Sequence, residues 1–133
     1  MRSIGHFSVV LIGLTVSAQA ISLPVDGTYG GGGGCEIAAV HGVEAVVEAG
    51  GTESFPESRT KGGESIIVMP SYAAGSDWVC KPGTVDGEYV ALECESWGAT
   101  WLPMPVAHFQ LSGETLRFTM PDEATLTLDR CPP

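Results

Sequence analysis

The sequence has few basic side chains. Its 133 residues include 6 Lys and Arg against 16 Asp and Glu, which gives a formal net charge of -10 at pH 7. Nucleic-acid binding needs clustered Lys and Arg against the phosphates, so this balance excludes a nucleic-acid-binding protein. It disfavours attachment to an anionic membrane surface for the same reason. The length predicts one domain at most.

The motifs of common catalytic and cofactor sites are also missing. The glycine run Gly30–Gly34 does not end in Lys-Ser or Lys-Thr, so it predicts a spacer or a strand crossover rather than a phosphate loop. Neither His41 nor His108 has a Ser or Cys nucleophile placed by motif, and both are distant in sequence from the cysteines. No Cys-x-x-Cys pair and no Asp-rich calcium loop occurs. The carboxylates alternate along expected strands, as on a solvated surface. We therefore expect no enzyme, no cofactor and no metal site.

The first twenty residues predict a signal peptide. Met1-Arg2 supplies a positive charge, residues 4–16 are mostly apolar, and Ala18-Gln19-Ala20 is a small-residue cleavage site. The apolar stretch is shorter than the ~20 residues that a membrane helix needs, so an uncleaved anchor is the weaker alternative. Cleavage leaves residues 21–133 as a single domain, and the loss of Arg2 makes its formal charge one unit more negative, -11. We expect an exported protein, periplasmic or secreted, that does not contact a membrane after cleavage.

Export changes the interpretation of the four cysteines. In an oxidising compartment an even number predicts disulfides, here two, with three possible connectivities. The cysteines are Cys35, Cys80, Cys94 and Cys131.

A hairpin argument favours one connectivity. Asp86-Gly87 is a strong turn dipeptide between two apolar stretches. A three-residue turn over 86–88 places Cys80 opposite Cys94, whereas a two-residue turn places Cys80 opposite Glu93. We therefore favour a Cys80–Cys94 bond, which closes a loop of about 15 residues and stabilises by ~3 kcal/mol. A bond between Cys35 and Cys131 follows by elimination.

The rest of the chain predicts strands. Segments 36–40 and 43–47 predict a hairpin around His41-Gly42, although their apolar residues also share one helical face. The polar stretch 52–63 predicts a loop, and a strand over 64–69 ends at a proline.

The last three expected strands form a meander. They cover residues 106–111, 115–120 and 124–130. A two-residue turn pairs Phe109 with Leu116, and a three-residue turn then pairs Phe118 with Leu126. These registers give one apolar face and one polar face. The apolar face comprises Ala107, Phe109, Leu111, Leu116, Phe118, Met120, Leu126 and Leu128. At the rim, Glu114 falls opposite Arg130.

About eight short strands joined by tight turns predict an all-β fold. An up-and-down antiparallel barrel is the first expectation, and a small β-sandwich is the alternative. A barrel of this size holds packed side chains or one small ligand. The chain is short, so the two disulfides are the expected supplement to a modest core.

One expected loop is unusually apolar. Residues 97–105 contain two tryptophans, a methionine and two prolines between strands. Exposed loops of this composition are typical of recognition sites. The alternative is that the tryptophans fold back and cap the barrel end, and a mixture is a third possibility. The candidate partner-binding residues are Trp97, Trp101, Leu102 and Met104.

Several short motifs resemble a known group of proteins. They are Gly27-Thr28-Tyr29, Trp78-x-Cys80, Leu92-Glu-Cys94 followed by Trp97-Gly98, and the closing Leu-Thr-Leu-Asp-Arg-Cys131. The pattern is similar to small exported bacterial proteins with a calycin-like, eight-strand barrel, among them periplasmic inhibitors of lysozymes and metalloproteases. The resemblance implies a barrel whose loops or terminal arm plug the active site of another protein. The Ser-Gly-x-Gly-Ala-x-Tyr stretch of membrane-bound lysozyme inhibitors is absent, so no functional residue is carried over.

The sequence thus predicts an exported, non-enzymatic binding protein, a candidate inhibitor of a lysozyme or protease that acts through residues 97–105. Its acidity suits a basic exported partner such as a lysozyme, with association steered electrostatically and weakened by salt. The alternative is a carrier of a small apolar ligand in the barrel interior.

Overall fold

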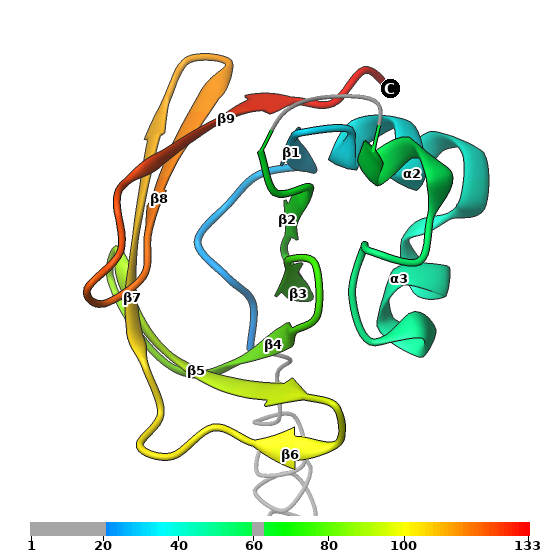
Figure 1. The fold of residues 1–133 in the computed structure, drawn as a ribbon. Coiled ribbons are helices and arrows are strands. Elements are labelled where there is room, and N and C mark those ends of the chain that lie inside the picture. The colour runs from blue at the N-terminus through cyan, green and yellow to red at the C-terminus, as the bar shows by residue number, and fades with distance from the viewer. Residues whose placement is uncertain (1–20, 60–62) are drawn as a thin grey trace, which may run out of the picture.

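The computed structural model describes residues 21–59 and 63–133; the expected signal peptide lies outside this range. Its strands are β1 (Tyr29–Gly31), β2 (Ile66–Met69), β3 (Tyr72–Ala74), β4 (Val79–Asp86), β5 (Tyr89–Ser96), β6 (Ala99–Thr100), β7 (Val106–Ser112), β8 (Thr115–Thr119) and β9 (Leu126–Arg130). All pairings between them are antiparallel and follow the order β4-β3-β2-β1-β9-β8-β7-β5, and the β4–β5 pairing closes the ring (Figure 1). Strand β6 pairs with β5 outside this ring. The eight-strand barrel predicted from the sequence is confirmed.

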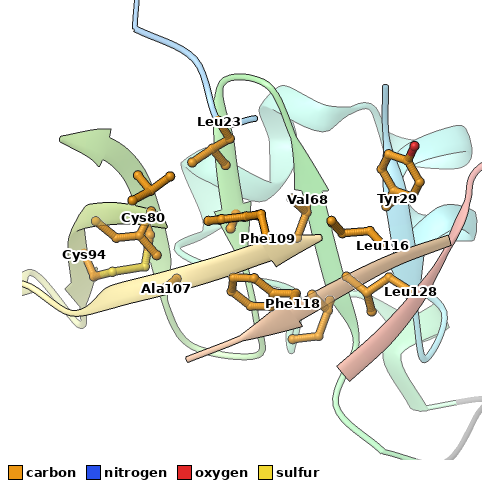
Figure 2. Close-up of a cluster of buried hydrophobic side chains, with 14 of the residues drawn as sticks. Leu23, Tyr29, Val68, Cys80, Cys94, Ala107, Phe109, Leu116, Phe118 and Leu128 are labelled. Atoms are coloured by element: carbon orange, nitrogen blue, oxygen red, sulfur yellow. A yellow bond between two sulfur atoms is a disulfide. The ribbon is translucent and has the colours of Figure 1, made fainter. Parts of the chain in front are cut away.

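The barrel interior is filled by apolar side chains. Alternate residues of each strand point inward, which is the period of two that a half-buried strand requires. On the last three strands the inward residues Ala107, Phe109, Leu116, Phe118 and Leu128 are buried as predicted (Figure 2). Leu111 and Leu126 belong to the same expected face, but they lie toward strand ends and are exposed. The predicted apolar face is therefore correct in the middle of the strands and too long at their ends.

The hairpin registers were predicted in part. Phe118 opposes Leu126 as predicted. Phe109, however, opposes Phe118 rather than Leu116, because the two turn residues are Gly113-Glu114, one position later than expected. The shift moves the register by two residues, so every side chain stays on its predicted face.

The Cys80–Cys94 disulfide is confirmed, but the turn that was expected to place it is different. The β4–β5 turn has two residues, Gly87-Glu88, and Asp86 opposes Tyr89. A β-bulge at Gly83 then shifts the register by one, which brings Cys80 opposite Cys94.

The predicted hairpin over residues 36–47 is wrong. The segment forms two short helices, α2 (Gly34–His41) and α3 (Val43–Ala49), with Gly42 at φ +88° between them. They cover the outer face of β2 and β3, where Ile37 and Val46 are fully buried against Ile67. Because β2 is apolar on both faces, its outer face needs this cover, and helices provide it. Within the described residues, no helix has the length and hydropathy to cross a membrane.

The expected loop 52–63 contains a 3₁₀ helix, η1 (Pro56–Arg59). His41 ends α2 instead of occupying a strand turn, and its Nε2 lies 2.9 Å from Glu57 Oε1. Phe55, the one large apolar residue of this stretch, packs beside the helices. The segment therefore belongs to the helical cover of the barrel.

One end of the barrel is covered by residues 21–28. Leu23 is buried in the interior cluster, and its amide donates to Pro70 O at 2.8 Å in the β2–β3 turn. In Figure 1 this segment, in blue, passes across the barrel before entering β1. The confirmed Cys35–Cys131 disulfide joins α2 to the chain just after β9. We call the barrel end that residues 21–28 cover the closed end.

Candidate binding site

The opposite end of the barrel carries the loops β3–β4, β5–β6, β6–β7 and β8–β9, and we call it the open end. It contains a pocket of about 530 Å³, the mouth pocket. Its main lining residues are Glu64, Trp78, Trp101, Phe118, Asp122 and Glu123. Phe118 and Trp78 also belong to the interior cluster, so the floor of the pocket is the top of the barrel core.

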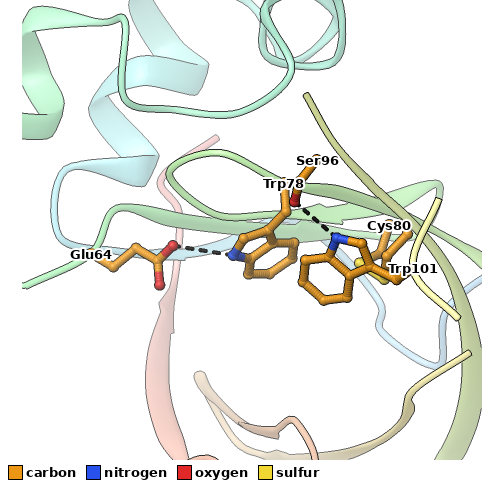
Figure 3. Close-up of a disulfide and its surroundings, with 6 residues drawn as sticks. Glu64, Trp78, Cys80, Ser96 and Trp101 are labelled. Carbon is orange, nitrogen blue, oxygen red and sulfur yellow. Dashed lines mark hydrogen bonds between the residues drawn. A yellow bond between two sulfur atoms is a disulfide. The ribbon is translucent and has the colours of Figure 1, made fainter. Parts of the chain in front are cut away.

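Two tryptophans form one wall of the mouth pocket. The rings of Trp78 and Trp101 have centroids 6.0 Å apart, beside the Cys80–Cys94 disulfide (Figure 3). The Trp101 amide donates to Cys94 O at 2.9 Å, and its indole Nε1 donates to Ser96 Oγ at 2.9 Å. These contacts fix the Trp101 ring against the barrel.

Glu64 was not predicted from the sequence as a site residue. Its Oε2 accepts hydrogen bonds from Ser76 N at 2.7 Å, Ser76 Oγ at 2.9 Å and Trp78 Nε1 at 3.2 Å. The contact needs Gly75, because a Cβ there would overlap both the Trp78 indole and the Glu64 carboxylate. Local sequence carries no signal for a pair fourteen residues apart, so only the fold reveals this position.

The four predicted binding residues separate into two groups. Trp101 is half-buried in the pocket wall, whereas Leu102 is 82% exposed and Met104 40% exposed. Trp97 is 81% exposed at the tip of the β5–β6 hairpin, with φ +52°, and its Nε1 donates to Asp77 Oδ2 at 3.2 Å. The expected loop thus contains the short strand β6, which was not predicted.

Three carboxylate residues lie beside the Trp97 side chain. A shallow hollow of about 240 Å³ beside it is lined by Glu48, Glu53 and Asp77. Glu48 lies near the end of α3 and Asp77 lies just before β4, so the folded chain brings them together from distant segments. The hollow beside this exposed indole is therefore acidic.

A charged cluster lies at the closed end. The Tyr29 hydroxyl donates to Asp26 Oδ1 at 2.6 Å, and the Arg130 guanidinium lies 4.9 Å from the Tyr29 ring centroid. Hydrogen bonds from Tyr29 and Arg130 hold the pKa of Asp26 below its usual value. Arg130 Nε also lies 2.9 Å from Glu114 Oε2, which confirms the predicted rim pair. Each charge in this cluster has a partner, as in a structural tie between strands.

His41 and His108 lie outside the mouth pocket. His108 Nε2 lies 3.0 Å from Glu88 Oε1, and its ring stacks on Tyr89 with centroids 4.4 Å apart. Among residues 21–59 and 63–133, no group of three or more His, Cys, Asp or Glu side chains is arranged to hold a metal ion.

Comparison with known proteins finds no matching family, no matching curated protein and no matching solved structure. The closed barrel is consistent with the calycin-like fold that the sequence motifs implied. Its two disulfides indicate an oxidising environment.

Proposed function

We propose that this chain is an exported, non-enzymatic binding protein that recognises a partner protein through the open end of its barrel. The observation that carries the proposal is the exposure of Trp97, Leu102 and Met104 within eight consecutive residues. Large apolar and aromatic side chains grouped on an otherwise polar surface are typical of protein interfaces.

The backbone conformation of Trp97 supports this interpretation. Trp97 and Gly98 both have positive φ, as a type I′ two-residue hairpin turn requires. Asparagine followed by glycine is the sequence that this turn favours, and a bulky residue is unfavourable at the first position. Trp97 therefore does not serve the turn itself, and a role in recognition accounts for its presence.

The charge distribution supports a basic partner. The chain has ten more acidic than basic side chains, and Glu48, Glu53 and Asp77 line the hollow beside Trp97. Complementary charge accelerates association, and added salt weakens it. A lysozyme or an exported protease inhibited by occlusion of its active site is the partner class that we propose.

The test is affinity capture at low salt from an exported-protein fraction, comparing the wild type with Trp97→Asn. The variant removes the indole but installs the preferred turn residue, so it should fold at least as well. We expect one specific basic protein on the wild type and about tenfold or greater loss on the variant. Val40→Asn, at an exposed site on α2, is the matched control and should retain the partner. Equal retention by wild type and Trp97→Asn would refute the proposal.

The mouth pocket supports a second candidate, a small-ligand carrier. The barrel interior is filled by buried side chains, so such a ligand would occupy the mouth pocket rather than the interior. Its volume of about 530 Å³ lies within the range of small-molecule sites, ~300–1,000 Å³. Native mass spectrometry of the protein purified from its producing cells tests this candidate, because a carrier should retain an adduct.

A further inference from the structure

We propose that the mouth pocket binds a small organic cation, an ammonium or guanidinium group on an apolar body. The pocket lies at the same open end as the exposed residues Trp97, Leu102 and Met104, but these three residues do not line it. A cationic ligand rests on the second candidate function, a carrier at the mouth pocket, and does not depend on the proposed protein partner.

The pocket walls provide the apolar part of the site. The rings of Trp78 and Trp101 lie close together in the wall, and Phe118, Met120 and Leu126 also line the pocket. Indole faces attract cations through their quadrupole, and tryptophan is the strongest of the aromatic side chains in this respect. A wall of two tryptophans thus accepts an apolar body and a positive charge together.

The charged groups of the pocket all have the same sign. Glu64, Asp122 and Glu123 line it, and no Lys, Arg or His of the described residues does so. An anionic ligand would be repelled, and a neutral apolar ligand would desolvate carboxylates without pairing them. These carboxylates therefore favour a positively charged ligand.

Glu64 is fixed in position before any ligand arrives. Its three hydrogen bonds from Ser76 and Trp78 all reach Oε2, so Oε1 accepts none from the described residues. The carboxylate is held beside the edge of the Trp78 indole, as Figure 3 shows. An acceptor held in this way loses little conformational entropy on binding, which favours affinity.

The size of the pocket favours a small molecule over a side chain of a partner protein. About 530 Å³ is the volume of a site for a drug-sized ligand and exceeds what one Lys or Arg side chain fills. Asp122 of the β8–β9 connection and Pro105 of the β6–β7 connection also line the pocket.

The test compares three probes of one shape and different charge: phenylbutylamine, phenylbutanol and phenylbutyrate. Two-dimensional NMR of the indole N–H signals reports the site, because Trp78 and Trp101 line the pocket and Trp97 does not. We expect the amine to shift the Trp78 and Trp101 signals at about tenfold lower concentration than the alcohol, and the carboxylate to leave them unchanged. Equal effects of amine and alcohol, or no shift with the amine, would overturn the inference.

Two charge-removing variants test whether the carboxylates of the pocket bind the amine. Glu64→Gln keeps an acceptor oxygen for Ser76 and Trp78, and Asp122→Asn suits a residue whose φ is +61°. Each should weaken amine binding by about threefold to tenfold and leave alcohol binding unchanged. Glu44→Gln, an exposed site on α3, is the control for net charge and should bind the amine like the wild type. If Glu64→Gln does not fold, the amine affinity of Asp122→Asn alone tests the inference. A folded variant that binds the amine as tightly as the wild type contradicts the inference.

Discussion

Two glycines determine the geometry around the Cys80–Cys94 disulfide. Gly83 forms the bulge that brings the two cysteines opposite each other, and Gly75 allows the Trp78 indole to reach Glu64. Both positions depend on the absence of a Cβ, which would overlap a neighbouring group. Composition alone could not single them out among 18 glycines.

At the scale of the residue, we predict that replacing Gly83 in the β-bulge destabilises the protein. A Cβ at Gly83 would lie 2.7 Å from Ala91 O, so Gly83→Ala must move the backbone of a paired strand. We expect a loss of about 1–3 kcal/mol in the free energy of unfolding, measured by urea denaturation with the disulfides intact. Gly113→Asn is the control, because its Cβ would meet no atom and Asn tolerates positive φ. A Gly83→Ala protein as stable as this control would show that the bulge does not need glycine.

At the scale of elements, the helical cover is tied to the barrel by Tyr72. This residue of β3 is buried beneath α3, and its hydroxyl donates to Val43 O at 2.6 Å. Burial raises the pKa of Tyr72 to about 12. The folded state therefore favours the protonated phenol, whereas an unfolded tyrosine loses its proton near pH 10.

Loss of the Tyr72 proton at high pH destabilises the folded state. The contribution of Tyr72 is complete below about pH 10 and is lost as the pH rises toward 12. We expect the free energy of unfolding to fall over this window, and to fall less steeply in Tyr72→Phe. Comparing urea denaturation of both proteins at several pH values measures the difference. An identical decline in both proteins would exclude Tyr72 as a source of the alkaline instability.

The same elements show what the sequence could and could not predict. The alternation of apolar residues in the last three strands predicted their faces, because register errors of two residues leave faces unchanged. The helices α2 and α3 were missed because short apolar segments fit a hairpin and a helix equally well. The unbroken apolar run Ile66–Met69 indicated that something must cover this strand, because a strand buried on both faces needs a covering layer.

At the scale of the whole molecule, the two barrel ends are chemically different. The closed end is covered by residues 21–28 and tied by paired charges around Arg130. All three tryptophans of the chain, Trp78, Trp97 and Trp101, are associated with the open end. The sequence indicated an apolar segment there, but the mouth pocket could not be predicted, because Glu64 and Asp122 meet only in the folded barrel.

The most direct test of the central claim is to map the captured partner on this protein by NMR, with the indole N–H signals as reporters of the open end. The account predicts that the partner shifts or broadens the Trp97 signal first, and less so at high salt. The backbone amides of Gly87 and Gly113, in turns at the other end, should be unchanged. Perturbation of those two amides with an unchanged Trp97 signal would contradict the account.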